Sequence, residues 1–432
     1  MSYRTGYVPR KNKIQWKWVL LVFVVVLLSF SLLDFGLKYQ RKEAVNLYGI
    51  CGLNDNATRN LIDQEKNENM MLIQDYLFYG ETLNFYAEPY VLDQKDEMAG
   101  KTVILKNLCT QEDYMFILEQ TIDGQIPIED LEPGVYLGYI MKNTQPYLLY
   151  MNEKVSDEFY TVTRYGKNHK VTIKADSSCF NNKEDEQDYL EQGYLFIEVE
   201  EQEAPDEVYD IVLDPGHFSY DAGNFLERGI QVKERTEAEE TYRMAVALKE
   251  ELEKLGLRVL VTRSSNTDIV NSYGLKGRLY KGYQAQAKYY IDIQMLSSSN
   301  ASIRGTQVIY SSYSSNRFAA TVYSSIIENT SLVSTETGRN LGILPSGRLD
   351  GFDGRMMIRE SGGRILAAGN YSKKARDENG SFAAESRFGM QAIILEYGYM
   401  SNSTDMEIWD SELQEIAEAT ATGIARYLRI DK

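Results

Sequence analysis

The sequence predicts an α/β fold for its C-terminal half, a doubly wound domain preceded by a small all-β domain and an N-terminal transmembrane helix. Three observations support this order. The segment 18–37 is almost wholly apolar, residues 81–178 hold short runs rich in Tyr, Val, Ile and Thr, and strands alternate with helices after residue 209. At 432 residues, of which 43% are hydrophobic, the chain is long enough for several packed domains.

The N-terminal segment has the features of a membrane anchor. A basic tail, residues 1–17, precedes an uncharged run from Trp18 to Leu33. Extended to residue 37, this run is roughly 20 residues long, enough to cross a lipid bilayer. The positive-inside rule then places the tail in the cytoplasm and the later domains outside the cell membrane, on a single-pass anchor. A buried core helix and a cleaved signal peptide are the alternatives, and they fit the flanking charge and the missing small-residue cleavage site less well.

The body of the protein is acidic. The formal net charge is −17 although the first 42 residues are basic. Such a surface repels phosphates, which argues against a nucleic-acid partner.

The cysteines are too few for a disulfide scaffold. Cys51, Cys109 and Cys179 all lie before residue 200, and none belongs to a Cys-x-x-Cys motif. An odd number cannot pair completely, so the sequence allows one disulfide without identifying its members.

Residues 38–208 divide into a stalk, a β-rich domain and a linker. In the stalk, residues 38–80, apolar side chains recur at helical spacing from residue 56 and end at Gly80. The domain at 81–178 holds short strand-like runs between turn residues, which is typical of a small sandwich or barrel. Its many tyrosines suit either a glycan-binding face or ordinary packing between strands. The acidic segment 179–208 is the predicted linker.

Strands and helices alternate over residues 209–432. Apolar runs predict the strands, and a 3.6-residue period predicts the helices. The predicted strands are 209–214, 257–263, 289–293, 305–310 and 392–398, and the predicted helices are 237–256, a short one within 275–288, and 411–429. This order is typical of a doubly wound α/β domain, in which ligands bind at the carboxyl ends of the strands.

Three side chains suited to metal-assisted hydrolysis occupy such positions. His217 follows the first predicted strand, Glu237 opens the long helix, and Glu396 follows an apolar run. A histidine and two carboxylates that meet at one sheet edge can bind zinc and supply a general base. Each also has a purely structural explanation, as a turn histidine, a helix N-terminal acid and half of a buried ion pair.

Taken together and in this order, these residues resemble the zinc-dependent N-acetylmuramoyl-L-alanine amidase family of the amidase-3 type. The matching segments are IVLDPGH (211–217), Asp221, Gly223, Glu237, VLVTR (259–263), Arg278, GTQVIY (305–310) and ILEYGYMSN (394–402). The resemblance covers residues 209–430. It implies an α/β amidase domain acting on peptidoglycan, at the amide between muramic acid and the L-alanine of the stem peptide.

The resemblance also implies roles for individual residues. His217 and Glu237 would bind Zn²⁺, a third ligand would come from the end of the strand 289–293, and Glu396 would take a proton from the attacking water. The third ligand position falls on Gln294, where the family has a histidine.

A glutamine at that position predicts a weakened zinc site. Its amide oxygen is neutral and a poorer zinc ligand than imidazole. Even the loss of a group that only hydrogen-bonds a ligand lowers metal affinity about 10- to 100-fold, so loss of a ligand should cost at least as much. Asp292 lies two residues before Gln294, on the same face of the strand, and is a candidate helper.

A long connection, residues 311–389, completes the domain, and it is either a lid or binding segment or a solvated insertion. Arg278 and Arg359 are candidate substrate-binding residues, and Arg355 and Arg364 are further cations in the connection. The leading prediction is a membrane-anchored peptidoglycan amidase that faces the cell wall. One alternative is a catalytically inactive amidase-like protein that binds peptidoglycan or regulates another wall hydrolase. Another is an anchored scaffold whose β-rich domain does the binding.

Overall fold

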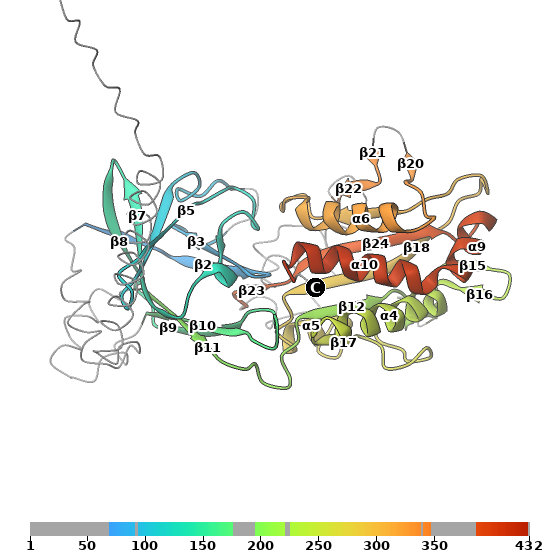
Figure 1. Cartoon of the computed structure of the whole chain (residues 1–432), viewed down its shortest axis with the longest axis horizontal. Helices are drawn as coiled ribbons and strands as arrows, with labels where there is room; N and C mark the ends of the chain where they lie inside the picture. Colours follow the sequence, from blue (N-terminus) through green and yellow to red (C-terminus); the bar gives the residue numbers. More distant parts are fainter. Residues whose placement is uncertain are drawn as a thin grey trace, which may run out of the picture.

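The computed structural model describes residues 69–90, 94–175, 195–220, 225–337, 340–346 and 386–430. It consists of a β-rich part followed by an α/β part, which lie side by side (Figure 1). No helix in the described ranges is long and apolar enough to cross a membrane, and the predicted anchor at 18–37 lies outside them.

The α/β part is built on a six-stranded, mostly parallel sheet. Its order is β17-β12-β18-β24-β19-β22, and only the β19–β24 pair is antiparallel. The strands are β12 (Ile211–Pro215), β17 (Val259–Val261), β18 (Tyr289–Leu296), β19 (Gln307–Tyr310), β22 (Ile343–Pro345) and β24 (Gln391–Tyr399). The three central strands β12, β18 and β24 run parallel, so their carboxyl ends meet at one edge of the sheet.

Helices cover both faces of this sheet, because successive strand residues point to opposite sides. Ile211 and Leu213 face a core shared with three helices, whereas Val212 between them faces a second core. The first core packs against α4 (Glu237–Lys254), α6 (Arg317–Asn329) and α10 (Leu413–Tyr427). The second packs against α5 (Arg278–Gln284), and α9 (Ser403–Ser411) follows β24. The predicted connection at 311–389 therefore contains a structural helix, α6, along with β20 (Glu336–Thr337), β21 (Asn340–Leu341), β22 and β23 (Phe388–Gly389).

The β-rich part consists of two sheets, one of eight strands and one of four, and the smaller sheet includes β23 from later in the chain. Its strands are β1 (Met70–Leu72), β2 (Asp75–Tyr79), β3 (Thr82–Tyr86), β4 (Thr102–Asn107), β5 (Asp113–Ile117), β6 (Ile126–Pro127), β7 (Gly134–Lys142), β8 (Gln145–Tyr150), β9 (Val155–Tyr160), β10 (His169–Ala175) and β11 (Phe196–Glu201). A short 3₁₀ helix, η1, spans Ile128–Asp130. The two sheets share a core of apolar side chains.

Both predicted boundaries of this β-rich part are wrong. The sequence predicts a helix-containing stalk up to residue 80, but β1 and β2 lie within it, since Tyr76 and Phe78 pack into the β-rich core. It also predicts a linker at 179–208, but β11 lies there and pairs with β10 and β7. The glutamates of β11 give this segment the composition of a linker, although its apolar residues Ile197 and Val199 are buried.

Cys109 is disulfide-bonded, and the remaining cysteines, Cys51 and Cys179, both lie outside the described residues.

Strand β23 joins the two parts of the molecule. It precedes β24 in the chain, yet it pairs in parallel with β2 of the β-rich part. The backbone N–H of Phe78 donates to the carbonyl of Arg387 at 2.8 Å, and the guanidinium of Arg387 lies 4.6 Å from the ring centroid of Tyr76. The β-rich part therefore holds the segment that leads into β24.

A buried ion pair forms a second junction. Two guanidinium nitrogens of Arg164 lie 2.9 and 2.6 Å from the carboxylate oxygens of Glu81, whose side chain is only 3% exposed. The hydroxyl of Tyr289, at the start of β18, donates to the same carboxylate at 3.2 Å. Arg164 also donates to the carbonyl of Leu428 at 2.9 Å. These contacts fix the amino ends of the sheet strands, opposite the edge that carries His217.

Candidate metal centre and active site

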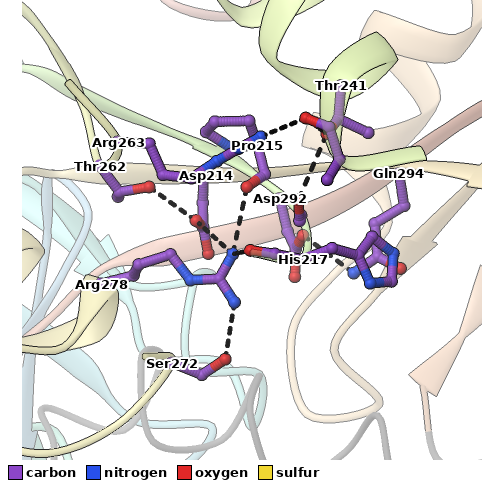
Figure 2. A network of polar contacts seen from close by, with 12 residues as sticks. Asp214, Pro215, His217, Thr241, Thr262, Arg263, Ser272, Arg278, Asp292 and Gln294 are labelled. Carbon is purple, nitrogen blue, oxygen red and sulfur yellow. Dashed lines mark hydrogen bonds and ion pairs between the residues drawn. The ribbon is translucent and has the colours of Figure 1, made fainter. Parts of the chain in front are cut away.

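His217 lies just past the carboxyl end of β12, in a strained backbone conformation. Its φ is +68°, and that of Phe218 is +54°, a region that side chains with a Cβ seldom adopt. Such strain persists only where the surroundings enforce it, and it concentrates at functional sites. Arg278 supplies part of that enforcement, since one of its guanidinium nitrogens donates to the carbonyls of Pro215 and His217, both at 3.1 Å (Figure 2).

Two carboxylates flank the His217 imidazole. Nδ1 lies 2.5 Å from Oε1 of Glu227, with which it forms a hydrogen bond. Nε2 lies 2.8 Å from Oε2 of Glu237, within ion-pair distance. Burial acts to lower the pKa of His217, but the contacts with Glu227 and Glu237 outweigh it and raise the pKa to about 9. Burial likewise acts to raise the pKa of Glu227, and its contact with His217 holds that pKa below the usual range.

Glu237 is buried at the first position of α4, where a carboxylate is favoured by the helix dipole. Its Oε1 accepts from the backbone N–H of Met295 in β18 at 2.8 Å, and its Oε2 accepts from that of Ile230 at 2.9 Å. Gly229 lies directly against this carboxylate. A Cβ at Gly229 would be 2.6 Å from Oε2 of Glu237 and 2.6 Å from Cδ2 of His217, so the close approach requires glycine.

Gln294 and Glu396 occupy the same edge. They are paired across β18 and β24, and a register shift follows between Gln294 and Leu296. The side-chain amide of Gln294 donates to Oδ1 of Asp292 at 3.0 Å, and both residues are buried (Figure 2). Glu396 is 5% exposed and accepts a hydrogen bond from the side chain of Gln307 in β19.

Asp214, near the end of β12, links this edge of the sheet to neighbouring side chains. Its carboxylate accepts hydrogen bonds from the hydroxyl of Thr262 at 2.7 Å and from the hydroxyl of Tyr290 at 2.5 Å. One carboxylate oxygen of Asp214 also lies 3.4 Å from a guanidinium nitrogen of Arg278. Arg278 is 3% exposed and also donates to Ser272 at 2.7 Å. These contacts give Arg278 a positioning role for the His217 loop, and its predicted contact with substrate stays a prediction.

Some predicted residues cannot be placed. Arg359, the other candidate for substrate binding, lies outside the described residues, as do Arg355, Arg364, Asp221 and Gly223. Glu227, which hydrogen-bonds His217, is the residue of this edge that the sequence did not indicate. It belongs to a small hairpin of two-residue strands, β13 (Ser219–Tyr220) and β14 (Leu226–Glu227), too short to leave a periodic signal.

The donors at this edge fit a zinc ion at two of three ligand positions. His217 Nε2 and Glu237 Oε2 lie 2.8 Å apart, so an imidazole nitrogen and a carboxylate oxygen, both atom types that bind zinc, meet at one point. Gln294, the predicted third ligand, carries an amide oxygen, which is a weaker zinc ligand than imidazole. Within the described ranges no group of three His, Cys, Asp or Glu side chains is arranged to hold a metal.

A histidine and a buried glutamate beside a second acid, at the carboxyl edge of a mostly parallel sheet, are features of metal-dependent α/β hydrolases. The chain belongs to the N-acetylmuramoyl-L-alanine amidase family: the Amidase_3 family model matches residues 211–426, half of the chain. Members of this family are typically zinc-dependent, and its substrate is peptidoglycan. No curated protein matches the chain.

Several solved structures are similar to about half of the chain. The catalytic domain of CwlV, an N-acetylmuramoyl-L-alanine amidase from Bacillus (Paenibacillus) polymyxa var. colistinus, is 23% identical, with 52% of this chain and 100% of that one covered and a TM-score of 0.35. An N-acetylmuramoyl-L-alanine amidase from Clostridium difficile 630 is 20% identical, with 52% and 100% covered and a TM-score of 0.35. The amidase AmiC2 of Nostoc punctiforme is 20% identical, with 52% and 99% covered and a TM-score of 0.32.

Proposed function

We propose that this protein hydrolyses the amide between N-acetylmuramic acid and the L-alanine of the stem peptide, and that it does so at the outer face of the cell membrane. The observation that carries the proposal is the meeting of His217, Glu237 and Glu396 at one sheet edge, within the residues that match the amidase family. The partners of such an enzyme would be the wall polymer and, through the N-terminal segment, the bilayer.

The ligand set would consist of His217, Glu237 and Gln294, with Asp292 holding the Gln294 side chain. Zinc, when bound, supplies a Lewis acid that activates water and polarises the scissile carbonyl. Because the protein binds a proton at His217 with a pKa of about 9, a cation must displace that proton, and metal affinity rises with pH.

Glu396 would act as the general base. It lies at the end of β24 in a buried position, and Gln307 orients it by a hydrogen bond to one oxygen. The carboxylate then takes a proton from the attacking water and returns it to the leaving amine of L-alanine. A buried acid is costly unless it is paired or has such a task.

Attachment to the membrane rests on the sequence of residues 18–37, whose length and flanking charge suit a single-pass anchor. A disulfide at Cys109 is in keeping with an oxidising compartment outside the cytoplasm. Together they support a location in which the β-rich and α/β parts face the wall.

The second candidate is a catalytically inactive protein that binds peptidoglycan or regulates another hydrolase. The glutamine at position 294 favours it, because a neutral amide oxygen is a weaker zinc ligand than an imidazole. In that case His217 and Glu237 form a proton-sharing pair rather than a metal site.

One experiment separates the two candidates. The full-length protein is purified in detergent, loaded with zinc, and incubated with peptidoglycan, and newly formed L-alanine amino termini are counted. Release by the wild-type protein supports the amidase. Release by Gln294→His alone, with wild-type protein that binds peptidoglycan without cleaving it, supports the inactive binder.

A further inference from the structure

The contact between Glu227 and His217 lies outside the ligand set proposed above. His217 Nδ1 and Glu227 Oε1 are 2.5 Å apart and form a hydrogen bond between an imidazole and a carboxylate. The contact is on the side of the imidazole away from Glu237, so it leaves Nε2 facing that carboxylate. A hydrogen bond at one ring nitrogen decides which of the two nitrogens is available as a ligand.

The backbone holds Glu227 in place for this contact. The carbonyl of Glu227 accepts from the N–H of Phe218 at 2.9 Å, and Glu227 pairs with Ser219 across the hairpin β13–β14. Its Oε1 also accepts from the N–H of Gly229 at 3.1 Å. The hairpin therefore brings Glu227 next to Phe218, so that the Glu227 carboxylate contacts the His217 imidazole.

The amino-acid sequence makes this imidazole unusually important. The protein has two histidines, and His169 belongs to β10 in the β-rich part. His217 is thus the one imidazole that the chain offers to the active-site edge. With Gln294 at the third position, metal affinity depends on how well His217 is oriented and how strongly it donates.

We propose that Glu227 is a positioning residue that fixes the His217 ring through Nδ1, presents Nε2 as the ligand atom, and strengthens its donation to a divalent cation. The inference rests on the proposed function for its metal, but the hydrogen bond itself is a property of the metal-free protein. A carboxylate that bonds a ligating histidine raises the basicity of the ring, and loss of such a group lowers metal affinity about 10- to 100-fold.

The test uses two readouts on the full-length protein and on Glu227→Gln. The control is Glu234→Gln, the same substitution at an exposed residue of the neighbouring turn. In ¹⁵N-histidine-labelled, metal-free protein, the imidazole signals of His217 report the Nδ1 hydrogen bond, and those of His169 serve as an internal reference. Zinc affinity is measured by competition with a chromophoric chelator.

The expected result is a strongly hydrogen-bonded Nδ1–H in the wild type and in Glu234→Gln, lost in Glu227→Gln while the His169 signals stay in place. Zinc affinity should fall about 10- to 100-fold in Glu227→Gln only. An unchanged His217 spectrum, or a zinc affinity that is equal in Glu227→Gln and wild type, would overturn the proposal. If the wild type binds no zinc, the proposed function loses its metal, and the imidazole signals alone decide whether Glu227 positions the ring.

Discussion

Replacing Gln294 with histidine tests whether position 294 is the third ligand of the proposed zinc site, because it exchanges an amide for an imidazole. Gln294 lies opposite Glu396 across β18 and β24 and is 9% exposed. Asp292 accepts from the present side chain at 3.0 Å, so the carboxylate is placed to accept from an introduced ring and fix it. The substitution therefore changes the ligand and leaves its supporting acid in position.

The expected gain follows from the type of ligand. Loss of a group that only supports a ligand lowers metal affinity about 10- to 100-fold, so exchange of an amide for an imidazole should gain at least that much, about 1.4–2.8 kcal/mol. The assay is chelator competition for zinc on the full-length protein. The matched control is Gln284→His on the exposed side of α5, which reports any zinc bound by an added surface histidine.

An affinity of Gln294→His within threefold of the wild type would refute the reasoning, because position 294 would then not face the cation. A gain of equal size in Gln284→His would refute it as well, since the added affinity would not belong to the site.

Three further predictions concern stability and the site. Glu81→Ala leaves Arg164 half-buried without its partner, so the free energy of unfolding in urea should fall by about 3–5 kcal/mol, and a loss below about 1 kcal/mol would contradict the ion pair's role. Gly229→Ala places a methyl 2.6 Å from a carboxylate oxygen of Glu237, at a backbone φ of +72°, so thermal stability and zinc affinity should both decrease. An unchanged zinc affinity would show that the Glu237 carboxylate can move without loss of metal binding. Burial lowers the pKa of Lys288 to about 8, against about 10.4 in the unfolded chain. Between these values the unfolded state binds more protons, so stability should rise with pH from 8 to 10, and Lys288→Met should remove that rise from urea midpoints measured across this range.

Much of the active-site edge could be predicted from sequence because its residues follow strands with a clear apolar pattern. His217 comes directly after the run that forms β12, and Glu396 interrupts the run that forms β24. Glu237 stands at the start of a helix with a clear 3.6-residue period. Parallel strands bring their carboxyl ends together, so the pattern alone places these groups at one edge.

Contacts between residues far apart in the chain could not be predicted in the same way. Strand β23 pairs with β2, about three hundred residues earlier in the chain. A strand of two residues is too short to show a periodic pattern in the sequence. The same holds for the hairpin that brings Glu227 to His217. In β1 and β2 the apolar residues also fit a helical spacing, and packing against the β-rich core decides in favour of strands.

The measurement that tests the central claim most directly is the release of L-alanine amino termini from peptidoglycan by zinc-loaded, full-length protein, compared with Glu396→Gln. Glu407→Gln, the same change at an exposed residue of α9, is the control. The wild type and the control should release amino termini at equal rates, and Glu396→Gln should be slower by about 10²- to 10⁴-fold because it lacks the general base. Equal rates for Glu396→Gln and wild type, or no release by the zinc-loaded wild type, would contradict the account.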